Sequence, residues 1–264
     1  MCHNSFYWLC IGRNNTIIKI SNIKKSFTNN TVLDDISFNI SEGEALSIIG
    51  KSGIGKSVLL KHLNGLLYPD SGYISIDNRI ISNMTFFDLE KVRSKISMVF
   101  QFGALFDSMT VGENIALGLN KMTDLDNKQI NKRITQTLEE VGMGGSEHKY
   151  PSELSGGMKK RVGIARAVAV KPKYILYDEP TTGLDPIMTD SINKLISKLH
   201  TNENITSIIV THEMRTVYDV TDRVLMLDDG KMRFDGKSSE IKNCSDPKVQ
   251  NFINGNSGLN TLKN

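Results

Sequence analysis

Gly50-Lys51-Ser52-Gly53-Ile54-Gly55-Lys56-Ser57 is the stretch that decides the fold. It fits the phosphate-loop pattern Gly-x-x-x-x-Gly-Lys-Ser/Thr at every defined position. A short β-rich run, Ala45–Ile49, leads straight into it, and a helix from about Lys56 to Leu66 is expected to follow. Glycines let the backbone turn tightly, so consecutive N–H groups can point at phosphates, and the following helix adds its positive end. The stretch therefore predicts a site for a nucleoside triphosphate.

Within this loop, two side chains carry the expected chemistry. Lys56 should reach the β- and γ-phosphates, and the hydroxyl of Ser57 should ligate Mg²⁺. Ile54 and Val58 are bulkier or more apolar than the Ser and Thr often found there, but neither position supplies a required side chain. The alternative is a chance glycine-rich turn before a helix, which the full match after a strand argues against. The predicted nucleotide-binding residues of the loop are Gly50, Lys51, Ser52, Gly53, Ile54, Gly55, Lys56, Ser57 and Val58.

A second motif follows a buried strand further along the chain. The apolar run Tyr174–Tyr177 ends in Asp178-Glu179, as expected for a strand buried on both faces. Phosphoryl transfer needs mainly positioning and charge neutralisation, so a carboxylate beside a metal ion suffices as general base. The alternative is an acidic pair that caps a helix before Pro180.

Between the two motifs lies the segment Leu154-Ser155-Gly156-Gly157-Met158. Apolar residues at Met158, Val162 and Ala165 predict a helix, for which Ser155 is the expected N-cap. Two glycines behind a serine cap leave free N–H groups at the positive helix end, which makes an anion site. The basic run at 159–161 is expected to be a solvated helix face.

The order of these motifs resembles one family, the ATP-binding cassette (ABC) ATPases, over about residues 16–240. The resemblance implies that Asp178 supports Mg²⁺ and that Glu179 orients and deprotonates the attacking water. It also implies that His212, in Val210-Thr211-His212-Glu213, contacts the γ-phosphate, and that Gln101 senses Mg²⁺ and the water. The expected catalytic residues are Glu179, His212 and Gln101, and the expected metal-binding residues are Ser57, Gln101 and Asp178.

The same resemblance assigns nucleotide contacts outside the phosphate loop. Phe27 lies where the family places an aromatic ring, usually Tyr, that stacks on adenine, with simple core packing as the alternative. Ser155, Gly156 and Gly157 are implied to close over the γ-phosphate of the other subunit in a head-to-tail homodimer, the ATP-bound state. Asp185, in Gly183-Leu184-Asp185, falls in the loop that links the two sites.

The distribution of apolar residues predicts the architecture. Short β-rich runs come first, at Ile17–Ile20 and Ile36–Ile40, and the pattern is mainly helical from about 88 to 169. After Asp178 helices and buried strands alternate, which favours a parallel sheet wrapped by helices. We therefore expect an α/β P-loop NTPase: a RecA-like parallel sheet flanked by helices, with an N-terminal antiparallel β part and an inserted α-helical lobe.

Composition sets further limits. Lys and Arg number 32 and Asp and Glu 29, so no strong field favours a nucleic-acid partner. The three cysteines form no close pair, which favours a reducing compartment. No apolar run approaches the ~20 residues of a membrane-spanning helix. Residues 1–15 are expected to be a disordered extension, 16–240 the nucleotide-binding domain, and 241–264 a C-terminal tail.

A finer resemblance lies directly after Gln101. The segment Phe102-Gly103-Ala104-Leu105-Phe106-Asp107 looks like the ATPases of Mla/Mce-type phospholipid transporters, as does the tail segment at 246–253. This implies a membrane permease partner, an Mce-domain lipid-binding subunit, and a place at the cytoplasmic face of the inner membrane, held there through the permease.

Other assignments remain open at this stage. The nearest is the ATPase of another importer or of a lipoprotein-release system. A soluble ABC protein of DNA repair or translation usually has a long coiled-coil insertion or a second cassette, and this chain has neither. A metabolic kinase would share the phosphate loop without the segment Leu154–Met158.

Overall fold

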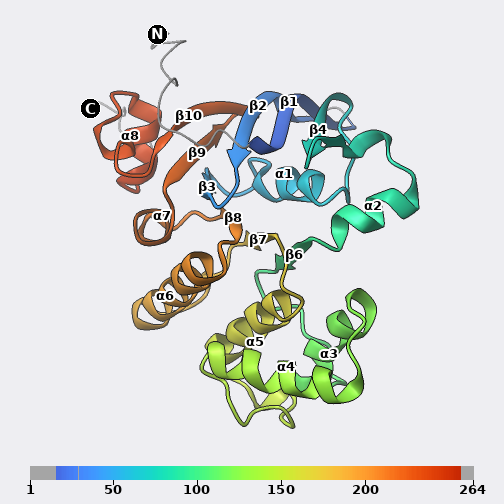
Figure 1. Cartoon of the computed structure of the whole chain (residues 1–264). Coiled ribbons are helices and arrows are strands. Elements are labelled where there is room, and N and C mark those ends of the chain that lie inside the picture. Colours follow the sequence, from blue (N-terminus) through green and yellow to red (C-terminus); the bar gives the residue numbers. More distant parts are fainter. Residues whose placement is uncertain (1–15, 29, 257–264) are drawn as a thin grey trace.

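Two β-sheets and a group of helices form the protein, of which a computed structural model describes residues 16–28 and 30–256 (Figure 1). The expected disordered extension, residues 1–15, lies outside the described residues, and so do Cys2, Cys10 and residues 257–264 of the expected tail. The predicted fold class is confirmed: an antiparallel sheet precedes a mainly parallel sheet that helices flank.

The antiparallel sheet has the strand order β2-β1-β4-β5. Its long strands β1 and β2 extend well beyond the apolar runs from which they were expected, because exposed polar residues continue the same pairing. The strands are β1 (Thr16–Phe27), β2 (Asn30–Ser41), β4 (Ser71–Ile76) and β5 (Arg79–Ile80).

A two-residue turn between β4 and β5 carries a carboxylate that joins the two sheets. Asp77 and Asn78 both have positive φ, 48° and 63°, as a type I′ hairpin turn requires. The Asp77 carboxylate accepts hydrogen bonds from Lys95 Nζ at 2.7 Å, Lys173 Nζ at 2.8 Å and the Tyr174 hydroxyl at 2.6 Å. Burial raises the pKa of Asp77, but these three donors outweigh it and the net pKa is lowered.

We expect Asp77→Asn to lower the free energy of unfolding at pH 7 by about 2–3 kcal/mol, since hydrogen bonds to a charged group are lost while the turn is kept. The pKa of Asp77 is lower in the folded state, so its contribution is present above the ordinary Asp pKa and is lost as pH falls through the folded value. Urea unfolding at pH 7 and at acid pH measures both effects. Asp124→Asn, at an exposed position, is the control; an equal effect of the two changes would contradict the assignment.

The second sheet has the strand order β10-β9-β3-β8-β7-β6. All neighbouring strands are parallel except the pair β9 and β10. Strands β3 and β8 are buried at every residue, including the small polar residues Ser47, Thr206 and Ser207, as strands covered on both faces must be. The strands are β3 (Ala45–Ile49), β6 (Ile96–Val99), β7 (Tyr174–Asp178), β8 (Thr206–Val210), β9 (Arg223–Asp228) and β10 (Lys231–Lys237).

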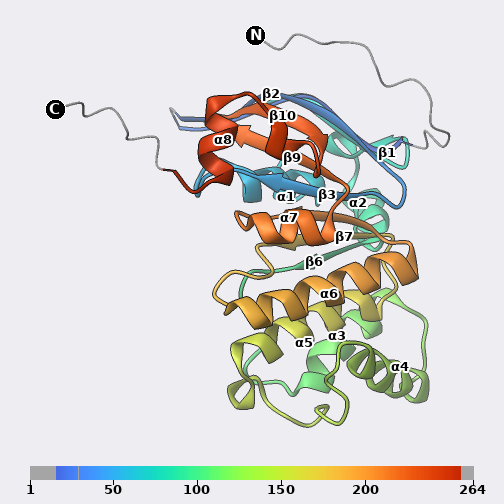
Figure 2. The same ribbon diagram turned by 90° about the vertical axis from the view of Figure 1, so that its left-hand side faces the viewer.

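Helices cover both faces of this parallel sheet (Figures 1 and 2). The helices are α1 (Lys56–Leu63), α2 (Phe86–Arg93), α3 (Val111–Met122), α4 (Asn127–Glu140), α5 (Gly156–Ala169), α6 (Pro186–Glu203), α7 (Met214–Val220) and α8 (Pro247–Ile253). Short 3-10 turns occur at Ile81–Asn83, Pro151–Glu153 and Ile241–Asn243.

Alternate residues of β7 enter two different cores. Tyr174 and Leu176 join the core that contains α1 and the antiparallel sheet, so α1 lies between the two sheets. Ile175 and Tyr177 join the core formed with α3, α4, α5 and α6. This strand is therefore held from both sides, which fixes the position of the acidic pair at its end.

The helical lobe consists of α3, α4 and α5, which lie together at one end of the molecule (Figure 1). The lobe begins later than the expected boundary near residue 88, because β6 pairs with β7 and belongs to the main sheet. The face of α4 follows the sequence pattern: Ile130, Ile134 and Leu138 are buried.

Part of the expected tail is packed onto the domain. Ile241 and Val249 are fully buried in a small core with Ile49, Val217 and Met226. The boundary predicted at residue 240 therefore divides a continuous packed region.

In the stretches that the structure describes, no helix combines the length and apolar character that a membrane span requires.

Candidate nucleotide-binding site

The phosphate loop follows β3 and opens α1, as its sequence predicts. Gly50 and Gly55 have φ of 148° and 107°, conformations that a side chain strongly disfavours. A Cβ at Gly50 would lie 2.5 Å from the carbonyl oxygen of Leu227, so no larger residue fits there. Because Gly55 is the N-cap of α1, the N–H groups of the first helical turn face the loop and are available to an anion.

Lys56 extends its ammonium group into this loop. Its Nζ donates hydrogen bonds to the carbonyl oxygens of Gly50 at 2.8 Å and Lys51 at 2.9 Å, and lies 3.9 Å from Glu179 Oε1. Burial lowers the pKa of Lys56, while Glu179 and Asp178 act in the opposite direction. A buried cation with carboxylates on one side is placed to meet a phosphate.

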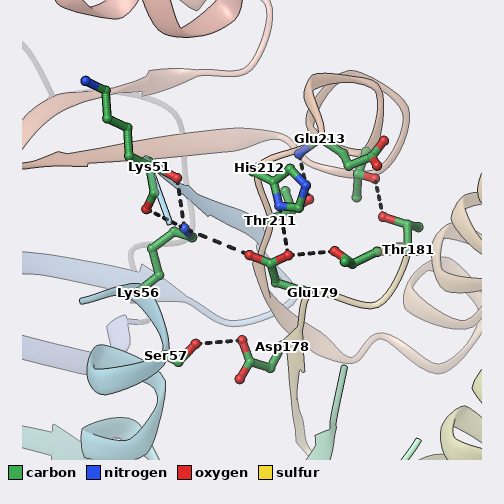
Figure 3. Close-up of polar contacts among 12 residues, drawn as sticks. Lys51, Lys56, Ser57, Asp178, Glu179, Thr181, Thr211, His212 and Glu213 are labelled. Carbon is green, nitrogen blue, oxygen red and sulfur yellow. Dashed lines mark hydrogen bonds and ion pairs between the residues drawn. The ribbon is translucent and has the colours of Figure 1, made fainter. Parts of the chain in front are cut away.

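The Ser57 hydroxyl and the Asp178 carboxylate lie next to each other below the phosphate loop (Figure 3). The Ser57 hydroxyl donates to Asp178 Oδ1 at 3.0 Å. Burial raises the pKa of Asp178, and the hydrogen bond from Ser57 opposes that rise. Two oxygens next to a phosphate site fit Mg²⁺, which keeps waters and phosphate oxygens among its ligands. Within the described residues no group of three or more His, Cys, Asp and Glu could enclose a metal alone.

Glu179 is the centre of the polar contacts in Figure 3. Its Oε2 accepts a hydrogen bond from Thr182 Oγ1 at 2.6 Å and lies 2.8 Å from His212 Nδ1. Its main chain has φ of 50°, a strained value for a residue other than glycine. The N–H of Glu179 donates to the carbonyl of Val210 at 2.9 Å. The carboxylate is thus held next to Lys56, and its role as the general base stays a prediction.

Neighbouring parallel strands deliver the predicted residues to one edge of the sheet. His212 follows β8, and Asp178 ends β7 directly beside Val210 of β8. Gln101 lies two residues beyond Val99 of β6, which pairs with Tyr177 of β7. The carboxyl ends of these strands meet at one edge, the usual place for a ligand in an open α/β sheet. The structure therefore places these residues at one sheet edge, and Asp178 and Glu179 reach the phosphate loop through Ser57 and Lys56.

The serine-glycine segment lies apart from this edge, at the start of α5. Ser155 is exposed and is the N-cap of α5, where its hydroxyl accepts a hydrogen bond from the Met158 N–H at 3.3 Å. Gly156 has open space where a Cβ would stand, whereas a Cβ at Gly157 would collide with Met188. The free N–H groups of this helix end are directed to the surface, so a ligand would approach them from outside.

Two further predicted residues are exposed. Phe27 keeps 42% of its surface exposed, so core packing is wrong for this ring, and Lys25 Nζ lies 5.5 Å from its centre. Asp185 is the N-cap of α6 and accepts hydrogen bonds from the N–H groups of Ile187 and Met188. Stacking on adenine and a role between two sites stay predictions for these residues.

Sequence reasoning missed Thr182 and misread Lys160. Thr182 and His212 both contact the carboxylate of Glu179. The sequence signal that could have indicated this contact is the hydroxyl residue three positions after Glu179. Lys160 was expected on a solvated face, but it is only 5% exposed and its Nζ donates to the carbonyl of Glu179 at 3.3 Å. The expectation was wrong because a run of basic residues gives no indication that the helix turns one member inward.

Comparisons with known proteins agree with this geometry. The family described as ABC transporter matches residues 33–182. "Protein TRIGALACTOSYLDIACYLGLYCEROL 3, chloroplastic" of Arabidopsis thaliana is 39% identical over 90% of this chain and 74% of its own length. The intermembrane phospholipid transport system ATP-binding protein MlaF of Haemophilus influenzae is 35% identical over 92% of both chains. The methionine import ATP-binding protein MetN of Carboxydothermus hydrogenoformans is 42% identical over 84% of this chain and 66% of its own length.

Solved structures give the same answer. A dimeric ATP-binding cassette in a post-hydrolysis state with bound ADP and phosphate has a TM-score of 0.78 and 32% identity, over 84% of this chain and 99% of that one. The chain belongs to the ABC transporter family. It is an ATPase subunit of that family, and it has both the cassette fold and the phosphate loop.

We expect Lys56→Ala to weaken ATP binding by at least about 100-fold, since two charge-assisted hydrogen bonds contribute roughly 1.5–3 kcal/mol each. Titration of the purified protein with a fluorescent ATP analogue measures the loss. Lys61→Ala removes an exposed lysine from the same helix and should leave affinity unchanged. Undiminished affinity of Lys56→Ala would refute the role of Lys56.

Proposed function

We propose that two copies of this chain trap MgATP between them and drive a membrane permease that moves phospholipid. The observation that carries the hydrolytic part is the contact network of Glu179 beside Lys56 and His212. In this proposal the phosphate loop of one subunit faces Ser155–Gly157 of the other, where Ser155 and Gly156 are exposed and Gly156 has open space beside it. The dimeric cassette to which the chain is similar supports such a pair.

Closure of the pair would follow from contacts with the γ-phosphate. Each charge-assisted hydrogen bond contributes roughly 1.5–3 kcal/mol, and a two-state element needs about 5.5 kcal/mol to pass from mostly open to mostly closed. Two shared sites, each gaining two or more such bonds, reach that value. Hydrolysis removes the phosphate, so the closed state loses its stabilisation.

Within each site, Ser57, Asp178 and Gln101 would hold Mg²⁺, which neutralises phosphate charge when bound. Glu179 would accept the proton of the attacking water. Nδ1 of His212 lies 2.8 Å from Glu179 Oε2; in this proposal that contact orients the imidazole so that its other nitrogen can contact the γ-phosphate. Phe27, exposed at the end of β1, would stack on adenine, and Asp185 would link the two sites of the dimer.

The permease contact would include the segment after Gln101. Phe102 and Phe106 are 80% and 56% exposed, and exposed aromatic side chains of this kind mark a protein interface. The proposed partners are a permease dimer and an Mce-domain lipid-binding subunit, with the chain at the cytoplasmic face of the inner membrane.

Phospholipid as the substrate rests on the segment at 102–107 and on two relatives. MlaF of Haemophilus influenzae and MlaF of Escherichia coli, the latter 38% identical over 87% of this chain, are named for phospholipid transport. The second candidate is import of a small solute, because MetN relatives match at 42% identity.

Reconstitution of the chain with its membrane permease in lipid vesicles separates these candidates. ATP hydrolysis in vesicles and transfer of labelled phospholipid are measured, each with and without methionine. Stimulation by phospholipid with transfer of the labelled lipid would support the proposal. Stimulation by methionine without lipid transfer would replace it with the importer.

A further inference from the structure

Lys160 is a buried charge on a helix whose exposed end is part of the proposed dimer site. Its side chain is 5% exposed, whereas that of the adjacent Lys159 is half-buried. Burial lowers the pKa of Lys160, and the Glu179 carboxylate opposes that shift. Removing an ammonium group from water is costly, so the position of Lys160 calls for a benefit elsewhere.

The contact of Lys160 falls on the main chain of Glu179. Lys160 Nζ donates to the Glu179 carbonyl at 3.3 Å, and the same carbonyl accepts from the Thr182 N–H at 3.3 Å. Glu179 has the strained φ of 50°, which persists only where surrounding contacts hold it. The carbonyl of Glu179 accepts from the Lys160 ammonium group, and the N–H of Glu179 donates to the Val210 carbonyl. Hydrogen bonds therefore restrain the main chain of Glu179 on both sides of its strained φ.

Helix α5 connects this contact with the surface. Gly156 and Lys160 are four residues apart, so they lie on one face of the helix, one turn from each other. The exposed first turn of α5 would receive the γ-phosphate bound by the partner subunit, and the next turn contacts the residue that activates water in its own subunit.

We propose that Lys160 is a positioning residue for ATP hydrolysis, which fixes the main chain of Glu179 to helix α5. The inference rests on the proposed role of Glu179 as general base. In this assignment Lys160 acts through its contact with the Glu179 carbonyl and thereby orients the Glu179 carboxylate. It also ties the two half-sites of one subunit together, because α5 carries one and Glu179 belongs to the other.

The test uses Lys160→Met in the full chain, which removes the charge and keeps an unbranched side chain of similar length. We expect kcat for ATP to fall on the order of 10- to 100-fold, since a small misplacement of a reacting group has effects of this size. KM and ATP affinity should change by less than about twofold, because Lys160 makes no ground-state contact with nucleotide. Thermal stability should stay equal or rise, since a buried charge is replaced by an apolar side chain.

Three companion variants complete the experiment. Lys160→Arg should recover part of kcat, because a guanidinium can still donate to the carbonyl, and Lys159→Met should behave as wild type. Lys160→Met in a Glu179→Gln background should cause no further loss in single-turnover rate, since two changes acting through one group are not additive. Wild-type kcat in Lys160→Met would overturn the inference, as would a joint loss of stability, ATP affinity and rate. Absence of hydrolysis by the wild-type chain would instead refute the proposed function.

Discussion

Glu179→Gln is expected to bind ATP with nearly wild-type affinity and to hydrolyse it about 10²–10⁴-fold more slowly, the usual effect of removing a general base. The amide keeps the size of the side chain and can still accept from Thr182 and His212, whose donors lie 2.6 Å and 2.8 Å from Oε2. It cannot take a proton from water at neutral pH. With hydrolysis blocked, the proposed closed dimer should accumulate.

Two measurements check this expectation. Phosphate release gives the rate, and light scattering with and without MgATP gives the mass of the particle. Glu203→Gln, at an exposed position near the end of α6, is the matched control and should neither slow hydrolysis nor trap a dimer. Wild-type turnover of Glu179→Gln would remove Glu179 from the mechanism.

Ser155→Arg is expected to leave ATP binding by the isolated subunit unchanged and to reduce hydrolysis by at least about 100-fold. Loss of the N-cap lowers the free energy of unfolding by about 1 kcal/mol, too little to unfold a domain of this size. The larger effect is in the partner: an arginine at the exposed helix end would occupy the space needed by the γ-phosphate of the other subunit. Ser152→Arg, at an exposed position three residues earlier, is the control.

Mixing two inactive variants makes the test of a shared site sharper. In a mixed dimer of Lys56→Ala with Ser155→Arg, both changes fall in one composite site and the other site is intact. Equal mixing should therefore recover about a quarter of wild-type hydrolysis, because half of the twofold pairs are mixed and each has one working site of two. If the site lay within one subunit, mixing would recover nothing, and the head-to-tail pair would be wrong.

The residues at the sheet edge were accessible from sequence because they occupy strand ends. Asp178 ends an apolar run and His212 follows the next buried strand, and parallel strands bring such ends together. Gln101 was assigned through the family resemblance, and it lies two residues beyond Val99 of β6. The phosphate loop needed only its glycines and Lys56, whose spacing is fixed by backbone geometry.

What escaped the sequence depends on how elements pack. The inward direction of Lys160 depends on how α5 packs against the rest of the domain, and no local sequence pattern encodes that packing. The packing of Val249 against Ile49 joins residues 200 positions apart in the chain. The length of β1 and β2 was underestimated because polar residues on an exposed face give no apolar signal.

The carbonyl oxygens that hold the Lys56 ammonium have a consequence for the speed of nucleotide capture. The carbonyl oxygens of Gly50 and Lys51 already accept hydrogen bonds from the Lys56 ammonium group. When a phosphate binds, its oxygens replace these carbonyl oxygens as partners of Lys56, and the loop does not need to become ordered first. Little chain entropy is then lost on association. We expect nucleotide association to be fast. The residence time of the nucleotide should depend on how readily Lys56 re-forms its hydrogen bonds with the two carbonyl oxygens.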